Sequence, residues 1–570
     1  MKKTNKTFKR FAAITSASLL AACAVAPVFT SMTSYAAVNN FTMSVPSGIE
    51  ASEIKNIKAY KIFECELVNG AFNVKSWAIN DPTLLGFAAD ISAADAAKAI
   101  NAAGYDIEAL AKKAATALTT NGISALSYED NTVTFASDLS IGYYLVVCDV
   151  ERDDKDDIAD TTTYDAKSLG MLTVTGRESD ENIGTGTAKV GLPKVEKKVQ
   201  EDQEDNYKNI ANATYETSDK SWNDVADYDI GDAVPFKLYG TMPENLDKYE
   251  AYYYCFNDTL DEQFDSAKNV VVKIDGNIVE PGDNLSVEVD GQNLTVSFKD
   301  IKTAAEDVTK KSIVTVEYTA VLNTTAVVGN PGQNNEVYLE YSNNPNFDYN
   351  PWDDSTENDT PEKGETPKDI VNVLTYAFKL DKTFFNAAGG DITAQEIANK
   401  TYEKAEFALT AEGKDLYFAP SDDENYDYVV VQPDATGATQ TLVLTEVGGE
   451  LLIRIKGLDE GTYTLKETKA PTGFNKAPDQ TVLISATTAN GQTWGGTGDT
   501  LSKFEYSIDN GTLTENADGI ASASMRNNQG TSLPGTGGIG TTIFYLGGGA
   551  MAAIGGIYLV SKRRMRKSEE

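Results

Sequence analysis

Short runs of apolar and β-branched residues alternate with polar turns along most of this chain. Each run has about the length of a β-strand and is bounded by Gly, Asn, Asp or Pro, which favour turns. The clearest runs are residues 57–63, 142–148, 234–239, 269–274, 312–322, 337–341 and the hairpin pattern at 441–455. Many short strands separated by turns predict a mainly β protein that is built from β-sandwiches.

Two stretches have a helical pattern instead. Residues 92–118 are rich in Ala, which is the strongest helix former, and residues 393–409 form a second helical stretch. The first stretch lies near the N-terminus of the chain. We therefore expect the first domain to carry helices in addition to its strands.

The first 36 residues have the pattern of a secretory signal peptide. A basic region (Lys2, Lys3, Lys6, Lys9 and Arg10) precedes an apolar run at 11–29, and Ser34-Tyr35-Ala36 is a small-x-small cleavage site. This segment should be removed on export. Residues 20–23 also fit a lipoprotein box, in which Cys23 would carry the lipid, and this alternative remains open.

The last 40 residues combine three features in a fixed order. Leu533-Pro534-Gly535-Thr536-Gly537 is followed by an apolar run at 539–561 and then by Lys562, Arg563, Arg564, Arg566 and Lys567. The run is long enough to cross a bilayer, and the basic residues favour the cytoplasmic side. This order resembles the LPxTG cell-wall sorting signal of Gram-positive surface proteins. The resemblance implies that a sortase cleaves between Thr536 and Gly537 and passes the Thr536 carbonyl to an amine.

About 490 residues lie between these two signals, which is enough for three domains. The boundaries follow composition, because residues 177–187 are rich in Gly and Thr and residues 343–368 are rich in Asn, Pro, Asp and Glu. The predicted organisation is a signal peptide at 1–36, a β domain with helices at 37–187, a second domain at 188–348, an acidic linker at 349–370, a third domain at 371–530 and the sorting signal at 531–570.

Composition excludes several classes of function. The chain has 85 Asp and Glu against 49 Lys and Arg, and its formal net charge of −36 repels nucleic acid. It contains no His, which excludes His-dependent catalytic triads and the commonest metal sites. The acidic runs at 153–160 and 422–427 lack the Gly turn and terminal Glu of an EF-hand loop. We therefore expect solvated loops there, and no metal or cofactor.

Cysteine contributes little to the predicted architecture. After export only Cys65, Cys148 and Cys255 remain, which is too few for a disulfide-stapled scaffold. Cys65 and Cys148 lie in strand-like runs of the first domain. They could form a disulfide, or both could be buried free thiols.

A lysine interrupts the apolar face of the opening strand in both the second and the third domain. Side chains alternate across a strand, so Lys197 shares a face with Val195 and Val199. Lys382 occurs in the same way among Phe378, Leu380 and Phe384. A lone buried ammonium group is too costly to leave unpaired. Lys198 and Lys379 are the alternatives if the register shifts by one residue or more.

An asparagine occupies the matching face at the end of each of these domains. Asn335 precedes the alternating positions Val337, Leu339 and Tyr341, and Asn527 follows Ala523 and Met525. Asn334 and Asn528 are the neighbouring alternatives. A neutral Lys amine can attack an Asn carboxamide, release ammonia and leave an isopeptide bond. Burial favours the neutral amine, and a buried carboxylic acid with a raised pKa supplies the proton.

Two motifs supply candidate acids by resemblance. Residues 461–474 read Gly-Thr-Tyr-Thr-Leu-Lys-Glu-Thr-Lys-Ala-Pro-Thr-Gly-Phe and closely resemble the E-box of collagen-adhesin B-type (Cna-B) domains. The resemblance implies an immunoglobulin-like (Cna-type) sandwich in which Glu467 is the catalytic acid for Lys382 and Asn527. Residues 256–260, Phe-Asn-Asp-Thr-Leu, resemble the F-x-D-T-[LM] segment of the isopeptide-forming middle domain of fimbrial subunits. Asp258 would then serve Lys197 and Asn335.

The whole chain resembles a backbone (major) subunit of Gram-positive sortase-assembled pili. The resemblance implies a structural protein, not an enzyme, which is secreted, polymerised with identical subunits by a pilus-specific sortase and attached to peptidoglycan by a housekeeping sortase. Minor or tip pilins and an unidentified host or bacterial surface ligand would be further partners. The alternative is a monomeric LPxTG wall-anchored adhesin, or a minor pilin, that uses the same domains as a stalk.

The polymer needs an acceptor lysine, which the family carries in a Y-P-K-[NH] motif between its first and second domains. Here the junction at 186–194 reads Gly-Thr-Ala-Lys-Val-Gly-Leu-Pro-Lys, with no Tyr-Pro before the lysine. Lys189 occupies the expected place and Lys194 is the fallback.

Overall fold

The computed structural model describes residues 40–530, apart from gaps at 69–70, 136–138, 153–163, 179–180, 203–220, 353–358, 394, 397–403, 490–493 and 495. The signal peptide with Cys23, the acidic run at 153–160 and the sorting signal at 531–570 lie outside the described residues. The chain forms two compact units. One contains Met1–Thr375 and Ala486–Lys503, and the other contains Tyr376–Ser485 and Phe504–Glu570.

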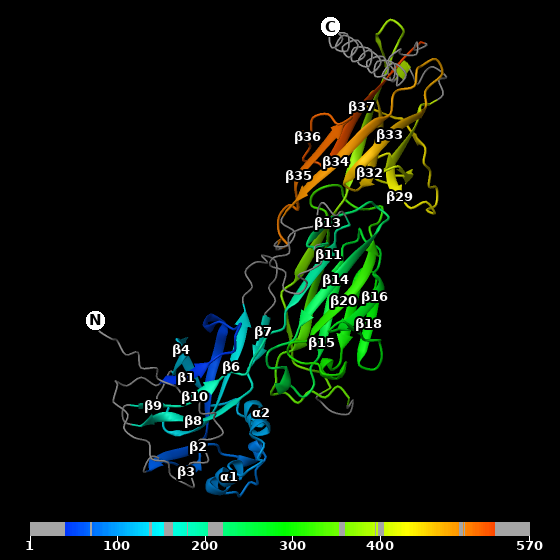
Figure 1. Cartoon of the computed structure of the whole chain (residues 1–570). Coiled ribbons are helices and arrows are strands. Elements are labelled where there is room, and N and C mark those ends of the chain that lie inside the picture. The colour runs from blue at the N-terminus through cyan, green and yellow to red at the C-terminus, as the bar shows by residue number, and fades with distance from the viewer. Residues whose placement is uncertain are drawn as a thin grey trace, which may run out of the picture. The chain divides into compact units, whose positions relative to one another are not determined.

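The first domain is built on a ten-stranded sheet in the order β10-β1-β5-β4-β2-β6-β8-β9, with β3 paired to β2 and β7 paired to β6 (Figure 1). Its strands are β1 Asn40–Ser44, β2 Ile54–Val68, β3 Ala71–Trp77, β4 Ile123–Glu129, β5 Thr132–Phe135, β6 Gly142–Arg152, β7 Tyr164–Lys167, β8 Met171–Glu178, β9 Glu181–Ile183 and β10 Thr185–Thr187. The long antiparallel pair of β2 and β6 forms the centre of this sheet.

The predicted helical stretch at 92–118 is two helices, α1 Ala93–Ile100 and α2 Ile107–Ala117. Each begins at a side-chain cap, because the Ser92 hydroxyl accepts from the Asp95 N–H and the Asp106 carboxylate accepts from the Ala109 N–H. The chain between the helices includes Gly104 at φ +85°, a conformation that stops a helix. The buried helix positions are Ala93, Ala96, Ile100, Leu110, Ala111 and Ala114, and they join the core formed with β2, β6 and β8.

The second domain consists of two sheets that face each other, and their strand pairs are antiparallel except for the parallel pair β13–β23. One has the order β12-β11-β14-β20-β16-β17, and the other runs β13-β23-β21-β15-β19-β18 with β22 paired to β21. The strands are β11 Val195–Gln200, β12 Trp222–Asn223, β13 Val225–Asp227, β14 Ala233–Thr241, β15 Tyr254–Leu260, β16 Lys268–Ile274, β17 Asn277–Ile278, β18 Leu285–Asp290, β19 Asn293–Phe298, β20 Ile313–Val321, β21 Gln333–Ser342, β22 Lys363–Glu365 and β23 Asp369–Leu374.

Strand β23 corrects the predicted boundary between the second and third domains. We placed the start of the third domain at residue 371, because residues 343–368 have the composition of a linker. In the structure, β23 pairs with β21 so that Asn335 lies opposite Val371, and it also pairs with β13. The sheet of the second domain therefore includes residues 369–374, and the second compact unit begins at Tyr376.

The third domain is also a two-sheet sandwich. One sheet has the order β25-β24-β32-β29-β28 with β31 on β32 and β37 on β24, and the other runs β27-β26-β33-β34-β35-β36 with β30 on β26. The strands are β24 Tyr376–Phe385, β25 Asp391–Ile392, β26 Glu406–Ala411, β27 Lys414–Asp415, β28 Tyr417–Pro420, β29 Tyr428–Val431, β30 Leu442–Val443, β31 Thr445–Val447, β32 Glu450–Leu458, β33 Gly461–Lys469, β34 Gln480–Thr488, β35 Leu501–Ile508, β36 Thr514–Glu515 and β37 Ile520–Asn528. The first strand β24 and the last strand β37 are parallel neighbours.

The predicted helix at 393–409 is wrong over its last four residues, because β26 begins at Glu406 and pairs with β33. Phe407 and Leu409 are both buried while Glu406 and Ala408 are only half-buried, which is the two-residue period of a strand. The apolar residues that suggested a helix face the core from one side of this strand.

Cys65 and Cys148 are both buried, and no disulfide joins the two in the described structure. Both lie on the same strand pair but far apart along it. The Cys65 N–H bonds the carbonyl of Ile141, whereas Cys148 follows Val147, which lies opposite Lys58. A disulfide needs Cα atoms within about 7 Å of each other, and several residues of extended strand exceed that distance.

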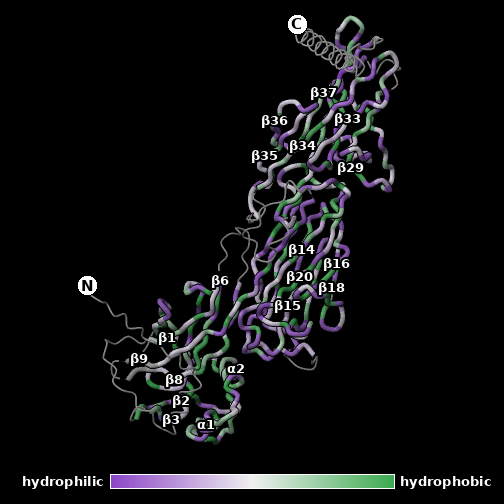
Figure 2. The backbone as a smooth tube through the Cα atoms, viewed as in Figure 1, coloured by the Kyte–Doolittle hydropathy of each residue, from purple (hydrophilic) through white to green (hydrophobic). Residues whose placement is uncertain are grey.

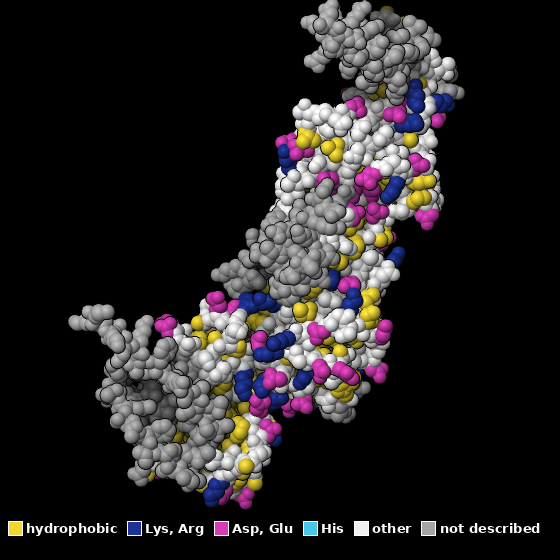
Figure 3. Space-filling model, in the orientation of Figure 1, with side chains coloured by type: hydrophobic (Ala, Val, Ile, Leu, Met, Phe, Trp, Pro, Cys, Tyr) yellow, Lys and Arg dark blue, Asp and Glu magenta, His cyan; other side chains and the backbone are white. Residues whose placement is uncertain are grey.

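Hydrophobic residues follow the strands of each domain, and the connecting loops are mostly hydrophilic (Figure 2). On the face shown in Figure 3, acidic and basic side chains are interspersed. The part of this face that is described therefore shows no single acidic patch.

Candidate sites for intramolecular amide bonds

The second domain brings Lys197, Asp258 and Asn335 together between its two sheets. Lys197 lies on β11 of one sheet, and Asp258 and Asn335 lie on the neighbouring strands β15 and β21 of the other. At most 1% of any of the three is exposed. The alternation that predicted an inward Lys197 therefore holds.

Polar contacts link these three side chains directly. The Lys197 ammonium contacts the Asp258 carboxylate, and its Nζ lies 2.6 Å from Asn335 Oδ1. Tyr318, on β20, also belongs to this cluster, because its hydroxyl lies 3.0 Å from Lys197 Nζ and 2.7 Å from Asp258 Oδ1. We did not predict Tyr318 from the sequence. The sequence did contain a signal for it. Buried and half-buried positions alternate along β20, and a Tyr at a buried position among Val and Ala needs a hydrogen-bond partner for its hydroxyl.

Burial shifts both ionisable partners toward their neutral forms. It lowers the pKa of Lys197 to about 8, although the nearby Asp258 carboxylate opposes this shift. Burial likewise raises the pKa of Asp258 against the opposing effect of Lys197. A neutral amine beside a protonated acid is the pair that attack on an amide requires.

The register alternatives in the second domain lie elsewhere. The Lys198 side chain contacts Asp224 and lies 2.9 Å from Glu196, and these acidic neighbours outweigh burial and raise its pKa. Asn334 is exposed, in contrast to the fully buried Asn335. Neither residue enters the Lys197 cluster.

The third domain brings Lys382, Glu467 and Asn527 together in a second buried cluster. Lys382 on β24 and Asn527 on β37 lie in adjacent parallel strands, and Glu467 comes from β33 of the opposite sheet. Lys382 Nζ contacts Asn527 Oδ1 and lies 3.4 Å from Glu467 Oε1, which is 2.8 Å from Asn527 Nδ2. All three are at most 2% exposed.

Two aromatic rings and one backbone group complete this cluster. The Lys382 ammonium lies 5.7 Å from the Phe384 ring and 5.3 Å from the Phe407 ring, and burial lowers its pKa to about 8. The Ala477 N–H donates to Glu467 Oε2 over 2.7 Å, which fixes the carboxyl group toward Asn527.

The alternatives in the third domain face outward. Asn528 is exposed, and the side chain of Lys379 is 38% exposed, with its Nζ 3.8 Å from Glu450. The strand alternation therefore distinguishes Asn527 and Lys382 from both of them.

The two candidate acceptor lysines have different surroundings. Lys189 is partly exposed, and its Nζ lies 3.0 Å from Glu108 on α2, which also binds Lys248 at 2.9 Å. Lys194 is exposed, and its backbone N–H donates to the Thr241 hydroxyl over 2.8 Å. Both amines can reach solvent, so exposure alone does not decide between them.

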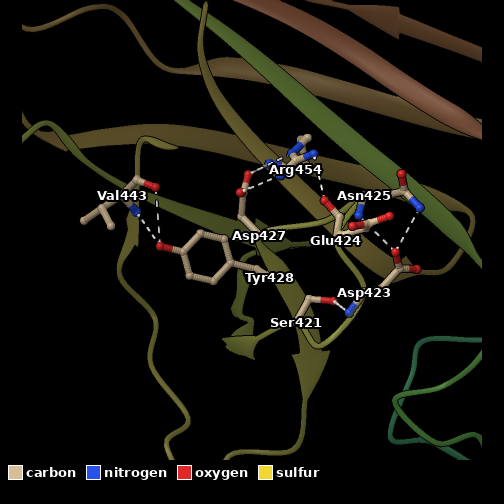
Figure 4. Close-up of polar contacts among 8 residues, drawn as sticks. All are labelled: Ser421, Asp423, Glu424, Asn425, Asp427, Tyr428, Val443 and Arg454. Atoms are coloured by element: carbon tan, nitrogen blue, oxygen red, sulfur yellow. Dashed lines mark hydrogen bonds and ion pairs between the residues drawn. The ribbon is translucent and has the colours of Figure 1, made fainter. Parts of the chain in front are cut away.

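The acidic run at 422–427 is an ion-paired loop (Figure 4). The Arg454 guanidinium binds Asp427 through two nitrogens at 2.9 and 3.2 Å and also bonds the Glu424 carbonyl. Asp423 accepts the backbone N–H of Asn425, and Lys456 Nζ lies 3.7 Å from its carboxylate. Among the described residues, no group of acidic or Cys side chains has the arrangement of a metal site.

The predicted membrane run at 539–561 lies outside the described residues. Within the part of the chain that is described, no helix is both long and apolar enough to cross a bilayer.

Comparison with known proteins places two segments in families. Residues 388–496 match the SpaA prealbumin-like fold domain, and residues 526–569 match the LPXTG cell wall anchor motif. No curated protein matches this sequence.

Among solved structures, the T6 backbone pilin of serotype M6 Streptococcus pyogenes superposes with a TM-score of 0.50 at 15% identity, covering 88% of this chain and all of that one. The major pilin SpaA of Corynebacterium diphtheriae gives 0.44 at 12% identity, over 86% of this chain and 100% of that chain. RrgB, the major pilin of Streptococcus pneumoniae, superposes with a TM-score of 0.38 at 15% identity, covering 73% of this chain and 88% of that chain.

The mainly β fold of immunoglobulin-like domains that the sequence predicted is confirmed. The resemblance found in the sequence is confirmed as well: this chain is a cell-wall-anchored surface protein that has a SpaA-type prealbumin-like domain and the fold of a backbone pilin.

Proposed function

We propose that this protein is the shaft subunit of a covalent pilus and that two intramolecular Lys–Asn isopeptide bonds stabilise it, Lys197–Asn335 and Lys382–Asn527. The observation that carries the proposal is the burial of a lysine, an asparagine and a carboxylic acid in direct contact in each of two domains. Three polar groups of these types are costly to bury. Conversion of the amine and amide into one neutral amide removes most of that cost.

The reaction balances with no added reagent. The neutral Lys Nζ attacks the Asn carboxamide carbon, and a new C–N bond replaces the bond to Nδ2. One proton leaves Nζ and one proton reaches Nδ2, which departs as ammonia. Asp258 and Glu467 accept and return these protons and end the reaction unchanged.

The bonds should be visible in the intact mass. The chain without its first 36 and last 40 residues, which keeps every described residue, should be lighter than its sequence mass by two ammonia molecules. Asp258→Ala and Glu467→Ala should each be lighter than their sequence mass by only one ammonia molecule. The double variant should have its full sequence mass. Asp265→Ala, which removes an exposed carboxylate of the second domain, is the matched control and should show the full deficit.

If the unmodified chain has its full sequence mass, neither bond forms and this part of the proposal is wrong. A deficit of two ammonia molecules in the Asp258→Ala and Glu467→Ala double variant would instead refute the role of the acids.

Bond formation should become faster as the pH rises toward 8. Burial lowers the pKa of Lys197 and Lys382 from 10.5 to about 8, so each neutral amine becomes the major species above about pH 8. The neutral fraction should rise about fiftyfold between pH 6 and pH 8. Newly synthesised chain can be shifted to each pH and its bonded fraction measured by mass after a fixed time. A rate that is faster at pH 6 than at pH 8 would contradict a neutral-amine nucleophile.

Export, sortase polymerisation and wall attachment complete the proposed function. The acyl group of Thr536 would pass to Lys189 of the next subunit, with Lys194 as the fallback, and finally to peptidoglycan. The second candidate function is a monomeric wall-anchored adhesin or minor pilin, which would carry the same anchor motif. It is favoured by one observation, the lack of Tyr-Pro before Lys189.

A further inference from the structure

The Tyr318 hydroxyl contacts every reacting group of the second-domain site. It lies 3.0 Å from Lys197 Nζ, 2.7 Å from Asp258 Oδ1 and 2.7 Å from Asn335 Nδ2. The Asn335 amide nitrogen donates its hydrogen bond to this hydroxyl, while the Asp258 carboxyl contacts Lys197 and Tyr318. The hydroxyl therefore lies between the acid and the nitrogen that must leave as ammonia.

The third-domain site lacks such an intermediary. Glu467 Oε1 lies 2.8 Å from Asn527 Nδ2, so this carboxyl group reaches the leaving nitrogen directly. The side-chain partners of Lys382 in the described structure are Glu467, Asn527 and the rings of Phe384 and Phe407. The Asp side chain is one methylene shorter than that of Glu. In the second domain the Tyr318 hydroxyl spans the remaining distance between the Asp258 carboxyl and the Asn335 amide.

We propose that Tyr318 is a catalytic residue of the second-domain reaction, in which its hydroxyl carries the proton from Asp258 to the departing nitrogen of Asn335. This inference rests on the proposed Lys197–Asn335 bond. Asp258 starts protonated on Oδ1. After attack, the Lys197 nitrogen gives a proton to Asp258 Oδ2. Tyr318 gives its own proton to Asn335 Nδ2 and takes one from Asp258 Oδ1. The C–Nδ2 bond breaks, ammonia leaves, and both Asp258 and Tyr318 regain their starting state.

A tyrosine hydroxyl has the properties that this role requires. It has one donor hydrogen and two acceptor lone pairs, so it can accept from one partner while it donates to another. Burial raises the pKa of Tyr318 well above 10, so the group stays protonated between transfers. Its ring packs on Phe236 at a centroid distance of 5.4 Å, which holds the hydroxyl in place.

The direct test is Tyr318→Phe, which removes the hydroxyl and keeps the ring. Newly synthesised chain, without the first 36 and last 40 residues, is sampled over time and the second-domain bond is quantified by peptide mass. We expect bond formation to slow about a hundredfold, at the lower end of general acid–base effects. The third-domain bond in the same molecules should form at the unmodified rate. Tyr252→Phe is the matched control, because the Tyr252 hydroxyl is buried and has no hydrogen-bond partner among the described residues.

A longer acid separates proton transfer from a packing role. In Tyr318→Phe combined with Asp258→Glu, the carboxyl group should reach Asn335 Nδ2 as Glu467 reaches Asn527. We expect this double variant to form the bond at least tenfold faster than Tyr318→Phe alone. A double variant that is no faster would overturn the relay, and so would a Tyr318→Phe rate equal to that of the unmodified chain. If the unmodified chain never forms the second-domain bond, the proposed bond itself fails, and that result is distinct from either of these.

Discussion

Glu467→Gln should lower the free energy of unfolding of the third domain by about 5 kcal/mol. The variant keeps the size of the side chain but removes the acid, so the Lys382–Asn527 bond should not form. That bond joins residues 145 positions apart, and the chain-entropy relation for disulfides gives about 5 kcal/mol for a loop of this length. The same relation applies because either covalent link restricts the unfolded chain.

Hydrogen exchange followed by mass spectrometry measures this loss within one domain. Amides of β24 and β33 that exchange only on global unfolding should exchange roughly three to four orders of magnitude faster, because each 1.4 kcal/mol is a factor of ten. Peptides from the second domain should be unaffected. Glu446→Gln, which changes an exposed Glu on β31, is the matched control.

The same substitution in a second variant distinguishes the effect of the bond on stability from the effect of local packing. In Asn527→Ala the bond cannot form, so adding Glu467→Gln can cost only the Lys382–Glu467 contact and should destabilise this chain less than it destabilises the unmodified one. If Glu467→Gln destabilises the Asn527→Ala chain as much as the unmodified chain, the effect belongs to local packing, and the bond contributes nothing.

Alternation along strands predicted that Lys197, Lys382, Asn335 and Asn527 are buried, although the neighbouring Lys198 is buried as well. Lys197 and Lys382 each share a face with apolar neighbours, and burial of their side chains follows directly from the two-residue period. The same two-residue period distinguishes the buried Asn335, which lies in the site, from its exposed neighbour Asn334. Local sequence determines these positions because side-chain direction is a local property of a strand.

Pairing between distant strands was not predictable in the same way. Tyr318 follows the sequence pattern of an ordinary core residue, and only the register of β20 against β14 brings its hydroxyl opposite Asp258. Strand β23 follows a long polar stretch, so composition assigned its first residues to a linker, although its partners β21 and β13 are in the second domain. Such pairings depend on contacts far apart in sequence, which no local pattern contains.

The sequence pattern of a lysine on the first strand of a domain and an asparagine near its C-terminal end corresponds to two different geometries. In the second domain the two residues come from opposite sheets, so a bond there would join the two layers of the sandwich. In the third domain they come from the neighbouring parallel strands β24 and β37. In either case, tension along the chain would pass through the bond and bypass the residues between its ends, which suits a subunit of a fibre under load.

Lys189→Arg should abolish the covalent polymer while leaving the subunit folded. Arg carries the same charge and can keep the ion pair with Glu108, but a guanidinium is not deprotonated in proteins and cannot attack the Thr536 acyl group. Wall material released by enzymatic digestion should show a boiling-resistant ladder for the unmodified protein on a denaturing gel, and only the monomer for this variant.

Lys194→Arg is the matched control for this experiment, because it changes the fallback lysine five residues away and should leave the ladder intact. A ladder that persists in Lys189→Arg and disappears in Lys194→Arg would move the acceptor to Lys194, and a ladder that persists in both would exclude the two lysines. A single monomer band from the unmodified protein, in cells that express its sortases, would favour the wall-anchored adhesin. The proposed amide bonds within the second and third domains are independent of these results, since they would form inside one chain and would need no sortase.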